Sequence, residues 1–306
     1  MKSIVEVNSK LNFSKKKIMW KQMLFPWLLL TPSIILLALV ISGPVIGTVA
    51  LSLTDWTGIG VPSFTGIDNY ARLATDSTFY ASLLNTMKWM GLFLTVPIIL
   101  SLVIAVLLSK VYRGQMVYRA IIFLPYIIST VVTAKIWQWI YNPYVGINLI
   151  LEKWGLSSLT RLWLGDEHIT LYAVAFADIW HSLGFYIVLF LVALHQTDST
   201  LEEAGKVEGA NPFQTFWHII LPQLRPTIVL ILMLTMIWSF AAFDYVYIMT
   251  QGGPGHASEM LATYMYKLAI YTYEPGYASA VAMTMGLFSF IVILGFGYIK
   301  KKGWDV

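Results

Sequence analysis

A small group of polar side chains lies in a stretch of sequence that is otherwise apolar. Asp178 and His181 are its ionisable members, about one helical turn apart, and Ser182 and Phe185 share a helical face with Asp178. A carboxylate near an imidazole could act as a general acid and base, relay an ion or hold a polar solute by hydrogen bonds. The two side chains could equally satisfy each other or a partner helix, so the pair alone does not decide between these chemistries.

A second mixed face follows further along the chain. Thr235, Trp238 and Ser239 share one side of a helix with Ala242, and Asp244 comes shortly after, where it could also form an external gate. Hydroxyl groups and aromatic rings suit an uncharged sugar, although Trp and Tyr also form belts at membrane surfaces. We therefore predict that the two groups line a path for a solute, with the following residues: Asp178, His181, Ser182, Phe185, Thr235, Trp238, Ser239 and Asp244.

Several kinds of catalytic site are excluded by what the sequence lacks. The chain has no cysteine, no H-E-x-x-H zinc motif and no G-x-x-x-x-G-K-[ST] phosphate loop. An intramembrane enzyme would need a nucleophile placed beside Asp178 and His181, and the sequence offers no such arrangement. We predict that the chain is not an enzyme, that it binds no metal or cofactor, and that any ATP hydrolysis occurs in another polypeptide.

Composition places these residues in an all-α integral membrane protein. Of the 306 residues, 58% are hydrophobic and 12% are charged, and the mean hydropathy is +0.69, which leaves too little polar side chain to coat a soluble globule. The net charge of +4 indicates basic residues sorted to one side of a membrane rather than a nucleic-acid partner. Six apolar segments are long enough to span a bilayer: 24–53, 81–109, 117–141, 169–196, 226–250 and 278–299.

These segments predict one transmembrane domain, 24–300, between a basic tail, 1–23, and a short tail, 301–306. The last five segments are expected to form the core, with the first packed outside it. Basic residues mark the cytoplasmic side of a membrane protein, and they favour both termini inside. Fourteen basic residues then lie inside (Lys2, Lys10, Lys15, Lys16, Lys17, Lys21, Lys110, Arg113, Arg119, Lys206, Arg225, Lys300, Lys301 and Lys302) against four outside (Arg72, Lys153, Arg161 and Lys267).

The charged loop 197–225 therefore faces the cytoplasm, and it is expected to form two short helices. Thr200 and Glu203 have the spacing of a capping box, and Gly209 can turn the chain at positive φ. Asn211 and Pro212 can then cap and open a second helix.

The second helix carries one apolar stripe, formed by Phe213, Phe216, Trp217 and Ile220 at i, i+3, i+4 and i+7. The stripe could lie on the membrane surface, against the protein's own helix ends, or against another protein. Because a membrane protein has little reason to keep a long, patterned, charged loop that contacts nothing, we predict that a soluble motor protein binds it.

The run from Glu203 to Pro222 resembles the cytoplasmic EAA signature of permease subunits in binding-protein-dependent ABC importers. That signature reads E-A-A-x-x-x-G followed nine residues later by I-x-L-P, and this chain departs from it at Gly205 and Glu208. The wider chain is similar to the oligosaccharide branch, which includes maltose and glycerol-phosphate permeases, in short matches such as Leu53-Thr54-Asp55-Trp56, Tyr118-Arg119-Ala120, Trp163-Leu164-Gly165-Asp166 and Gly252-Gly253-Pro254-Gly255.

The resemblance implies the type I importer permease fold and a loop that seats in a groove of the ATPase as a coupling helix. It implies a second permease subunit in a heterodimer, two ATPase subunits that bind ATP and Mg²⁺, an extracytoplasmic solute-binding protein, and a multi-pass location in a bacterial or archaeal cytoplasmic (inner) membrane. The outer loops 54–80, 142–168 and 251–277 would receive the binding protein. The residues expected to couple to the ATPase are Glu203, Ala204, Gly205, Glu208, Gly209, Ala210, Phe213, Phe216 and Pro222.

A permease subunit of an ATP-driven sugar importer is thus the leading prediction. The same fold could instead import glycerol phosphate or another small solute, although no Arg lies in the middle of a predicted span. A secondary transporter driven by an ion gradient could use Asp178 and Asp244 as proton or sodium sites, but it would not explain the loop 197–225.

Overall fold

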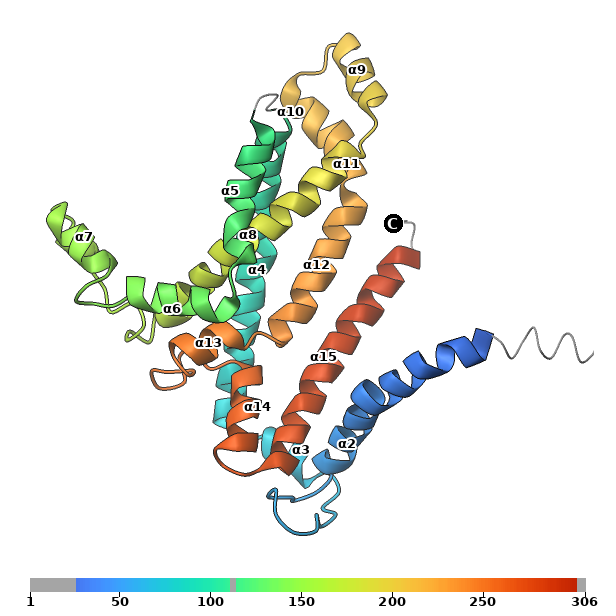
Figure 1. Cartoon of the computed structure of the whole chain (residues 1–306), viewed down its shortest axis with the longest axis vertical. Coiled ribbons are helices and arrows are strands. Elements are labelled where there is room, and N and C mark those ends of the chain that lie inside the picture. The colour runs from blue at the N-terminus through green and yellow to red at the C-terminus, as the bar shows by residue number, and fades with distance from the viewer. Residues whose placement is uncertain (1–25, 111–113, 302–306) are drawn as a thin grey trace, which may run out of the picture.

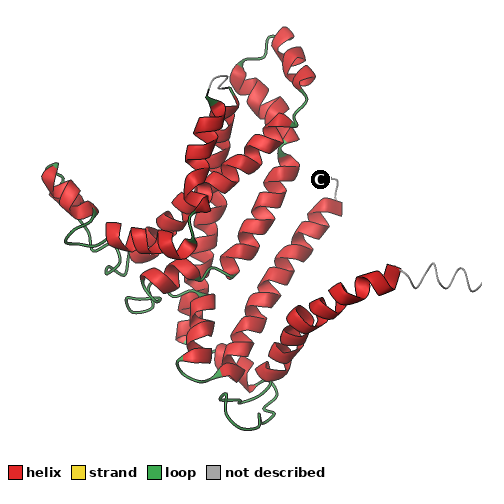
Figure 2. Cartoon of the chain, viewed as in Figure 1, coloured by secondary structure: helices red, strands yellow, loops and turns green. Residues whose placement is uncertain are grey.

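The computed structural model describes residues 26–110 and 114–301 (Figure 1). The predicted basic tail, 1–23, and all but the first residue of the predicted tail, 301–306, lie outside the described residues. Within the described ranges the regular structure is helical (Figure 2), and the only β pairing there is an isolated bridge between Thr54 and Phe64. The sequence prediction of an all-α protein is confirmed.

The elements follow one another as helices joined by turns and loops. They are η1 (Ala38–Ser42), α2 (Gly43–Ser52), α3 (Asp68–Leu73), α4 (Ser77–Ser109), α5 (Gln115–Ile127), α6 (Thr130–Ile140), α7 (Ile147–Lys153), η2 (Ser157–Leu159), α8 (Thr170–His195), α9 (Ser199–Val207), α10 (Pro212–Thr215), η3 (Phe216–Ile220), α11 (Leu221–Gln223), α12 (Arg225–Phe240), α13 (Asp244–Met249), α14 (Leu261–Ile270) and α15 (Pro275–Lys301). The elements η1 and η3 are π-helical, and η2 is a 3₁₀ turn.

The described residues contain six apolar segments when each bent pair of helices is counted as one. Four are continuous helices: Pro26–Ser52, Ser77–Ser109, Thr170–His195 and Pro275–Tyr298. The other two are bent pairs, with an angle of 90° between Met116–Ile127 and Thr130–Ile140, and of 65° between Pro212–Gln223 and Arg225–Phe240.

The apolar segment predicted over 117–141 is present, but it is not one straight helix, because the chain breaks between α5 and α6. Pro125 cannot donate a backbone hydrogen bond, and Ile128 adopts extended backbone with φ −71° and ψ 140°. The helix resumes only after Ser129. The third apolar segment is therefore two short helices at a right angle.

The apolar segment predicted over 226–250 is likewise divided into two helices. The helix α12 ends at Phe240, and a separate helix, α13, begins at Asp244. Between them Phe243 has φ −135° and ψ −56°, which lies outside the helical region. The helix α13 packs against α6, so the two short helices lie together beside α8 (Figure 1).

The helix α8 is the centre of the bundle, and it packs against α4 and α5 along its length (Figure 1). Half of the residues in its apolar stretch (50%) are buried, against 11% for Pro275–Tyr298 and 0% for Pro26–Ser52. The first helix therefore lies outside the core and packs on α15, as the sequence predicted.

Gly184 sets how closely α5 can approach α8. A Cβ atom at this position would lie 2.5 Å from the backbone oxygen of Ile122 and 3.0 Å from the Cα atom of Phe123. These are backbone atoms, so they cannot turn aside as a flexible side chain could. A glycine at this point allows the two backbones to touch, as small residues do between membrane helices.

Gly184→Ala is expected to destabilise the protein by about 1–3 kcal/mol, because the added methyl group overpacks the α5–α8 contact. Gly91→Ala in α4 is the matched control, since nothing lies within 4 Å of its added Cβ atom. Thermal unfolding of the two variants in the same detergent checks the expectation. Equal melting temperatures for both variants would contradict it.

At the end of the bundle remote from α9, Asp76 joins α4 to the C-terminal helices. Its carboxylate caps α4 by accepting the N–H groups of Thr78 (2.8 Å) and Phe79 (3.2 Å). It also accepts the hydroxyl groups of Tyr277 (2.6 Å) and Tyr264. Partial burial acts to raise the pKa of Asp76, but these four hydrogen bonds outweigh it and hold the pKa below the usual value of 3.8.

The depressed pKa of Asp76 predicts how stability depends on pH. A carboxyl group whose pKa is lower in the folded state contributes stability above about pH 3.8, and this contribution is lost as the pH falls through the folded pKa. Asp76→Asn should lack this loss. Melting temperatures measured between pH 5 and pH 2 should therefore converge for wild type and variant at low pH, whereas a constant difference would contradict the assignment.

Candidate functional site

The predicted path residues surround two adjoining cavities beside the middle of α8. All of them except Asp244 line a cavity of about 260 Å³, and Asp244 lines a neighbouring cavity of about 180 Å³. The two cavities share Trp89, Asp178, His181 and Ala242 as walls. The structure therefore brings together side chains from α8, α12 and α13 that the sequence placed in separate groups.

Four aromatic wall residues were missed from the sequence. Trp89 and Phe93 of α4 stack on each other with ring centroids 5.0 Å apart, and Tyr126 and Tyr186 complete the larger cavity. Their residue types do not distinguish them from the other aromatic residues of the spans. Which aromatic side chains face inward depends on how the helices cross, and only the right-angled break after α5 brings Tyr126 to the cavity.

Asp178 and His181 do not satisfy each other, but His181 does satisfy a partner helix, which was the other part of that interpretation. The Nε2 atom of His181 lies 2.9 Å from the backbone oxygen of Ile128, at the break between α5 and α6. Because a carbonyl oxygen only accepts, Nε2 carries the proton and donates to it. His181 thus supplies the partner that the Ile128 carbonyl would otherwise lack.

The carboxylate of Asp178 has no hydrogen bond or ion pair within the described part of the chain. Its backbone oxygen accepts the Ser182 hydroxyl at 2.8 Å, but the two carboxylate oxygens stay available to the cavities. An unpaired acidic group inside a membrane protein is costly, and such groups most often serve a function.

The hydroxyl groups of the larger cavity are oriented by the helices that carry them. Ser239 donates to the Thr235 carbonyl at 2.7 Å, and the hydroxyl groups of Tyr186 and Thr235 are 3.2 Å apart. Since the Ser182 and Ser239 protons are committed to backbone carbonyls, both side chains present lone pairs to the cavity and act there as acceptors.

Aromatic rings also line the larger cavity. Phe185 contacts Tyr126 with centroids 5.2 Å apart and Trp238 with centroids 5.9 Å apart. Trp238 is 47% exposed and is one of the residues that line the cavity. The arrangement combines flat apolar surfaces with hydrogen-bond acceptors.

The loop 197–225 lies at the far end of the bundle from α14, where α9 projects outward (Figure 1). The predicted capping box at Thr200 and Glu203 is wrong, because Asp198 caps α9 instead. The Asp198 carboxylate accepts the side chain (2.7 Å) and the backbone N–H (2.9 Å) of Thr200, and these two bonds lower the pKa of Asp198. The helix therefore begins at Ser199.

The turn and the second cap of the loop match the prediction. Gly209 has φ +85°, and Asn211 forms a capping box with Gln214, with Pro212 in the first helical position. Glu203, Ala204, Glu208 and Gly209 are exposed, and Ala210 and Pro222 are half-buried.

The second helix changes from α-helix to π-helix at Phe216, where the hydrogen bonds run from i to i+5. The aromatic residues of the predicted stripe still contact one another, since the ring centroid of Trp217 lies 6.0 Å from that of Phe213 and 5.8 Å from that of Phe216. Phe213 (70% exposed) and Trp217 (49% exposed) face outward, whereas Phe216 and Ile220 are half-buried.

Gly205 allows α9 to pack against this π-helix. A Cβ atom at Gly205 would lie 2.5 Å from the Cδ1 atom of Ile219. The EAA signature has alanine at this position, and here the Ile219 side chain occupies the space that the alanine methyl group would need.

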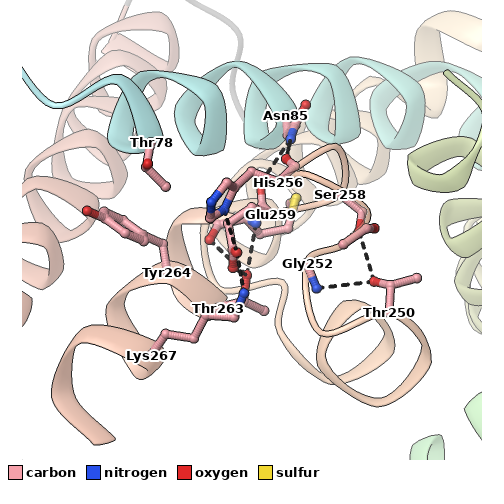
Figure 3. A network of polar contacts seen from close by, with 12 residues as sticks. Thr78, Asn85, Thr250, Gly252, His256, Ser258, Glu259, Thr263, Tyr264 and Lys267 are labelled. Atoms are coloured by element: carbon pink, nitrogen blue, oxygen red, sulfur yellow. Dashed lines mark hydrogen bonds and ion pairs between the residues drawn. The ribbon is translucent and has the colours of Figure 1, made fainter. Parts of the chain in front are cut away.

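A buried carboxylate that was not identified from the sequence holds the chain between α13 and α14 (Figure 3). Glu259 is fully buried, and it pairs with Lys267 and with His256 (3.2 Å). Thr263 donates to Glu259 at 2.6 Å, and Asn85 of α4 donates to the backbone oxygen of Glu259 at 3.1 Å. The network fixes the loop that leads out of α13 against α4.

The fold and these sites define a multi-pass membrane transport component rather than an enzyme. Residues 98–302 match the family of binding-protein-dependent transport system inner membrane components, and the chain belongs to that family. It is 34% identical over 283 residues to the probable ABC transporter permease protein YurN of Bacillus subtilis, covering 91% of this chain and 95% of YurN.

Two further comparisons agree with this family. The chain is 31% identical over 291 residues to the trehalose/maltose transport system permease protein MalF of Thermococcus litoralis, covering 94% of this chain and 95% of MalF. Its fold is that of a permease chain in the crystal structure of a bacterial alginate ABC transporter in complex with a periplasmic protein that holds an alginate pentasaccharide. That match has a TM-score of 0.82 and 22% identity, and it covers 95% of this chain and 98% of the other.

His181→Ala is expected to destabilise the protein by about 1–3 kcal/mol, since it leaves the part-buried Ile128 carbonyl without a partner. Ser182→Ala, on the next residue, is the control because it removes only a bond within α8. Thermal unfolding of the purified variants measures the difference. If both variants melted together, His181 would have no role in holding the break.

Proposed function

We propose that this chain is one permease half of an ATP-driven importer of uncharged sugars. The observation that carries the proposal is the pair of cavities at the middle of α8, whose walls combine acceptor groups with aromatic rings. Relatives named for sugars support it: trehalose/maltose for MalF of Thermococcus litoralis, xylose/arabinose for XacH of Haloferax volcanii, and multiple sugars for MsmF of Streptococcus mutans.

The charge of the cavities favours an uncharged solute over an anion. Neither Lys nor Arg is among the residues that line them, whereas Asp178 and Asp244 both are. Glycerol phosphate would place its negative charge beside these carboxylates without a basic partner. A sugar instead donates its hydroxyl protons to Asp178 and Ser239, and rests an apolar ring face on Trp238.

In this proposal the loop 197–225 is the coupling element. Its exposed residues, including Glu203, Glu208 and Phe213, contact one of two separate ATPase subunits, which bind ATP and Mg²⁺. The loop leaves α8 directly and enters α12 through η3 and α11, and both α8 and α12 line the larger cavity. A push on the loop therefore acts on the two helices that hold the solute.

The remaining partners follow from the same assignment. A second, homologous permease completes the path as a heterodimer, and a solute-binding protein docks on the outer loops 54–80, 142–168 and 251–277. The excess of basic residues supports a cytoplasmic position for both termini and the loop 197–225. In this proposal 24–300 is one transmembrane domain in the inner membrane of a bacterial or archaeal cell.

Trp238→Ala is expected to raise the sugar concentration for half-maximal uptake by at least about tenfold, because the main apolar contact is lost. The assay uses the complete transporter in vesicles with its binding protein, and it compares trehalose, maltose, xylose and arabinose. Trp139→Ala, a tryptophan that is 66% exposed and lines neither cavity, is the control. Unchanged uptake of every transported sugar in Trp238→Ala would contradict the proposed path.

Gly209→Val is expected to uncouple ATP hydrolysis from uptake, because valine strains a turn at φ +85° and displaces α10 from α9. Gly155→Val is a matched control in an outer loop, with φ +74° and likewise nothing within 4 Å of the added Cβ atom. Uptake per ATP hydrolysed should fall for Gly209→Val alone. An equal effect of the two substitutions would argue against coupling through this loop.

A further inference from the structure

A third cavity lies at the C-terminal end of α8, away from the proposed sugar path. It has a volume of about 250 Å³ and is lined by Arg119, Val188, Leu191, Val192, His195 and Gln196. Neither of the sugar cavities includes any of these residues. Nothing in the proposed transport or coupling function uses this cavity.

Arg119 gives the cavity a positive charge that the described residues leave uncompensated. One of its guanidinium nitrogens, Nη2, lies 3.2 Å from Nε2 of His195, and its Nε atom is buried without a hydrogen-bond partner. Asp198, the next acidic residue after α8, uses its Oδ1 atom to cap α9 through Thr200. No Asp or Glu lines the cavity.

His195 interacts with Arg119 as an acceptor and adds no charge. Its Nδ1 atom faces the backbone oxygen of Leu191, which can only accept, so Nδ1 carries the proton. The lone pair of Nε2 then receives an N–H from Arg119. This contact orients the guanidinium group while leaving its other N–H groups for an external acceptor.

The lining changes from polar to apolar along α8. His195 and Gln196 lie at the helix end, whereas Val188, Leu191 and Val192 lie up to about 10 Å deeper at 1.5 Å per residue. Val192 is 53% exposed and Val188 is partly exposed, so the apolar wall is open to the surroundings. A phospholipid presents the same order at a membrane surface, with its phosphate above the first acyl carbons.

We propose that this cavity binds the headgroup of an anionic phospholipid, with the phosphate on Arg119 and the upper acyl chain against Val188 and Val192. Arginine suits this role because its planar group forms two parallel hydrogen bonds to phosphate oxygens. A sugar is a poor occupant because the wall holds no aromatic ring. The site lies at the end of α8 that leads into the loop 197–225, and it does not depend on which solute is transported.

Native mass spectrometry of the complete transporter, isolated by affinity purification of this subunit, tests the proposal. Delipidated protein is titrated with phosphatidylglycerol or with phosphatidylcholine, and bound lipids are counted. Arg119→Gln should weaken phosphatidylglycerol binding at one site by about fivefold and leave phosphatidylcholine unchanged. Val192→Phe, which fills the cavity and keeps the charge, should weaken the same site.

Lys110→Gln is the matched control, because Lys110 is an exposed cation at the same end of the bundle and does not line the cavity. Inorganic phosphate is added in a separate arm, where it should not displace the lipid at equal concentration. Thermal unfolding in phosphatidylcholine confirms that each variant is folded. Equal losses for Arg119→Gln and Lys110→Gln, no loss for Val192→Phe in folded protein, or displacement by free phosphate would each overturn the proposal.

Discussion

A helix that breaks inside a membrane must find partners for the backbone groups that it frees, and the centre of this protein depends on how one such break is satisfied. The carbonyl of Ile128 is freed where α5 ends, and His181 of α8 donates to it. Gly184, on the next turn of α8, lets the backbone of α5 come into contact. Together these two residues stabilise the right-angled break relative to a continuous straight helix.

The shape of the cavities follows from that break. Because α5 stops at Ile127, Tyr126 turns toward Phe185, and α6 leaves at 90° to pack with α13. The break in the fifth apolar segment after Phe240 has the matching effect on the other side, since it brings Asp244 to the smaller cavity. Two straight spans in these places would put both Tyr126 and Asp244 elsewhere.

The helix α8 connects the break after α5 to the cavity beside Arg119 and to the loop 197–225. It carries Asp178 and Phe185 in the sugar cavities, His195 beside Arg119, and then leads into the cap at Asp198. Since half of its apolar stretch is buried against neighbouring helices, a displacement of its end moves packed side chains rather than a free surface. This is the physical link between the loop 197–225 and the solute path.

Much of the architecture could be predicted from the residues, and the failures have physical causes. Apolar length predicted the number of spans, and the turn chemistry of Gly209 and Asn211 predicted the second half of the loop. The break after Phe240 has no Gly or Pro to mark it, and the capping-box spacing of Thr200 and Glu203 did not reveal that Asp198 caps the helix. The roles of Trp89, His181 and Glu259 depend on contacts between distant segments, which spacing along one helix does not reveal.

The chain has no native cysteine, so a single introduced thiol reports directly on access to the cavity. The decisive measurement is the labelling rate of Ser182→Cys by a membrane-impermeant thiol reagent in the complete transporter, with and without ATP. Ser109→Cys, exposed at the end of α4, is measured beside it. If the cavity is part of a path driven by the ATPases, ATP changes the labelling of Ser182→Cys from each side of the membrane and leaves that of Ser109→Cys unchanged. Labelling of Ser182→Cys that does not respond to ATP would contradict the account.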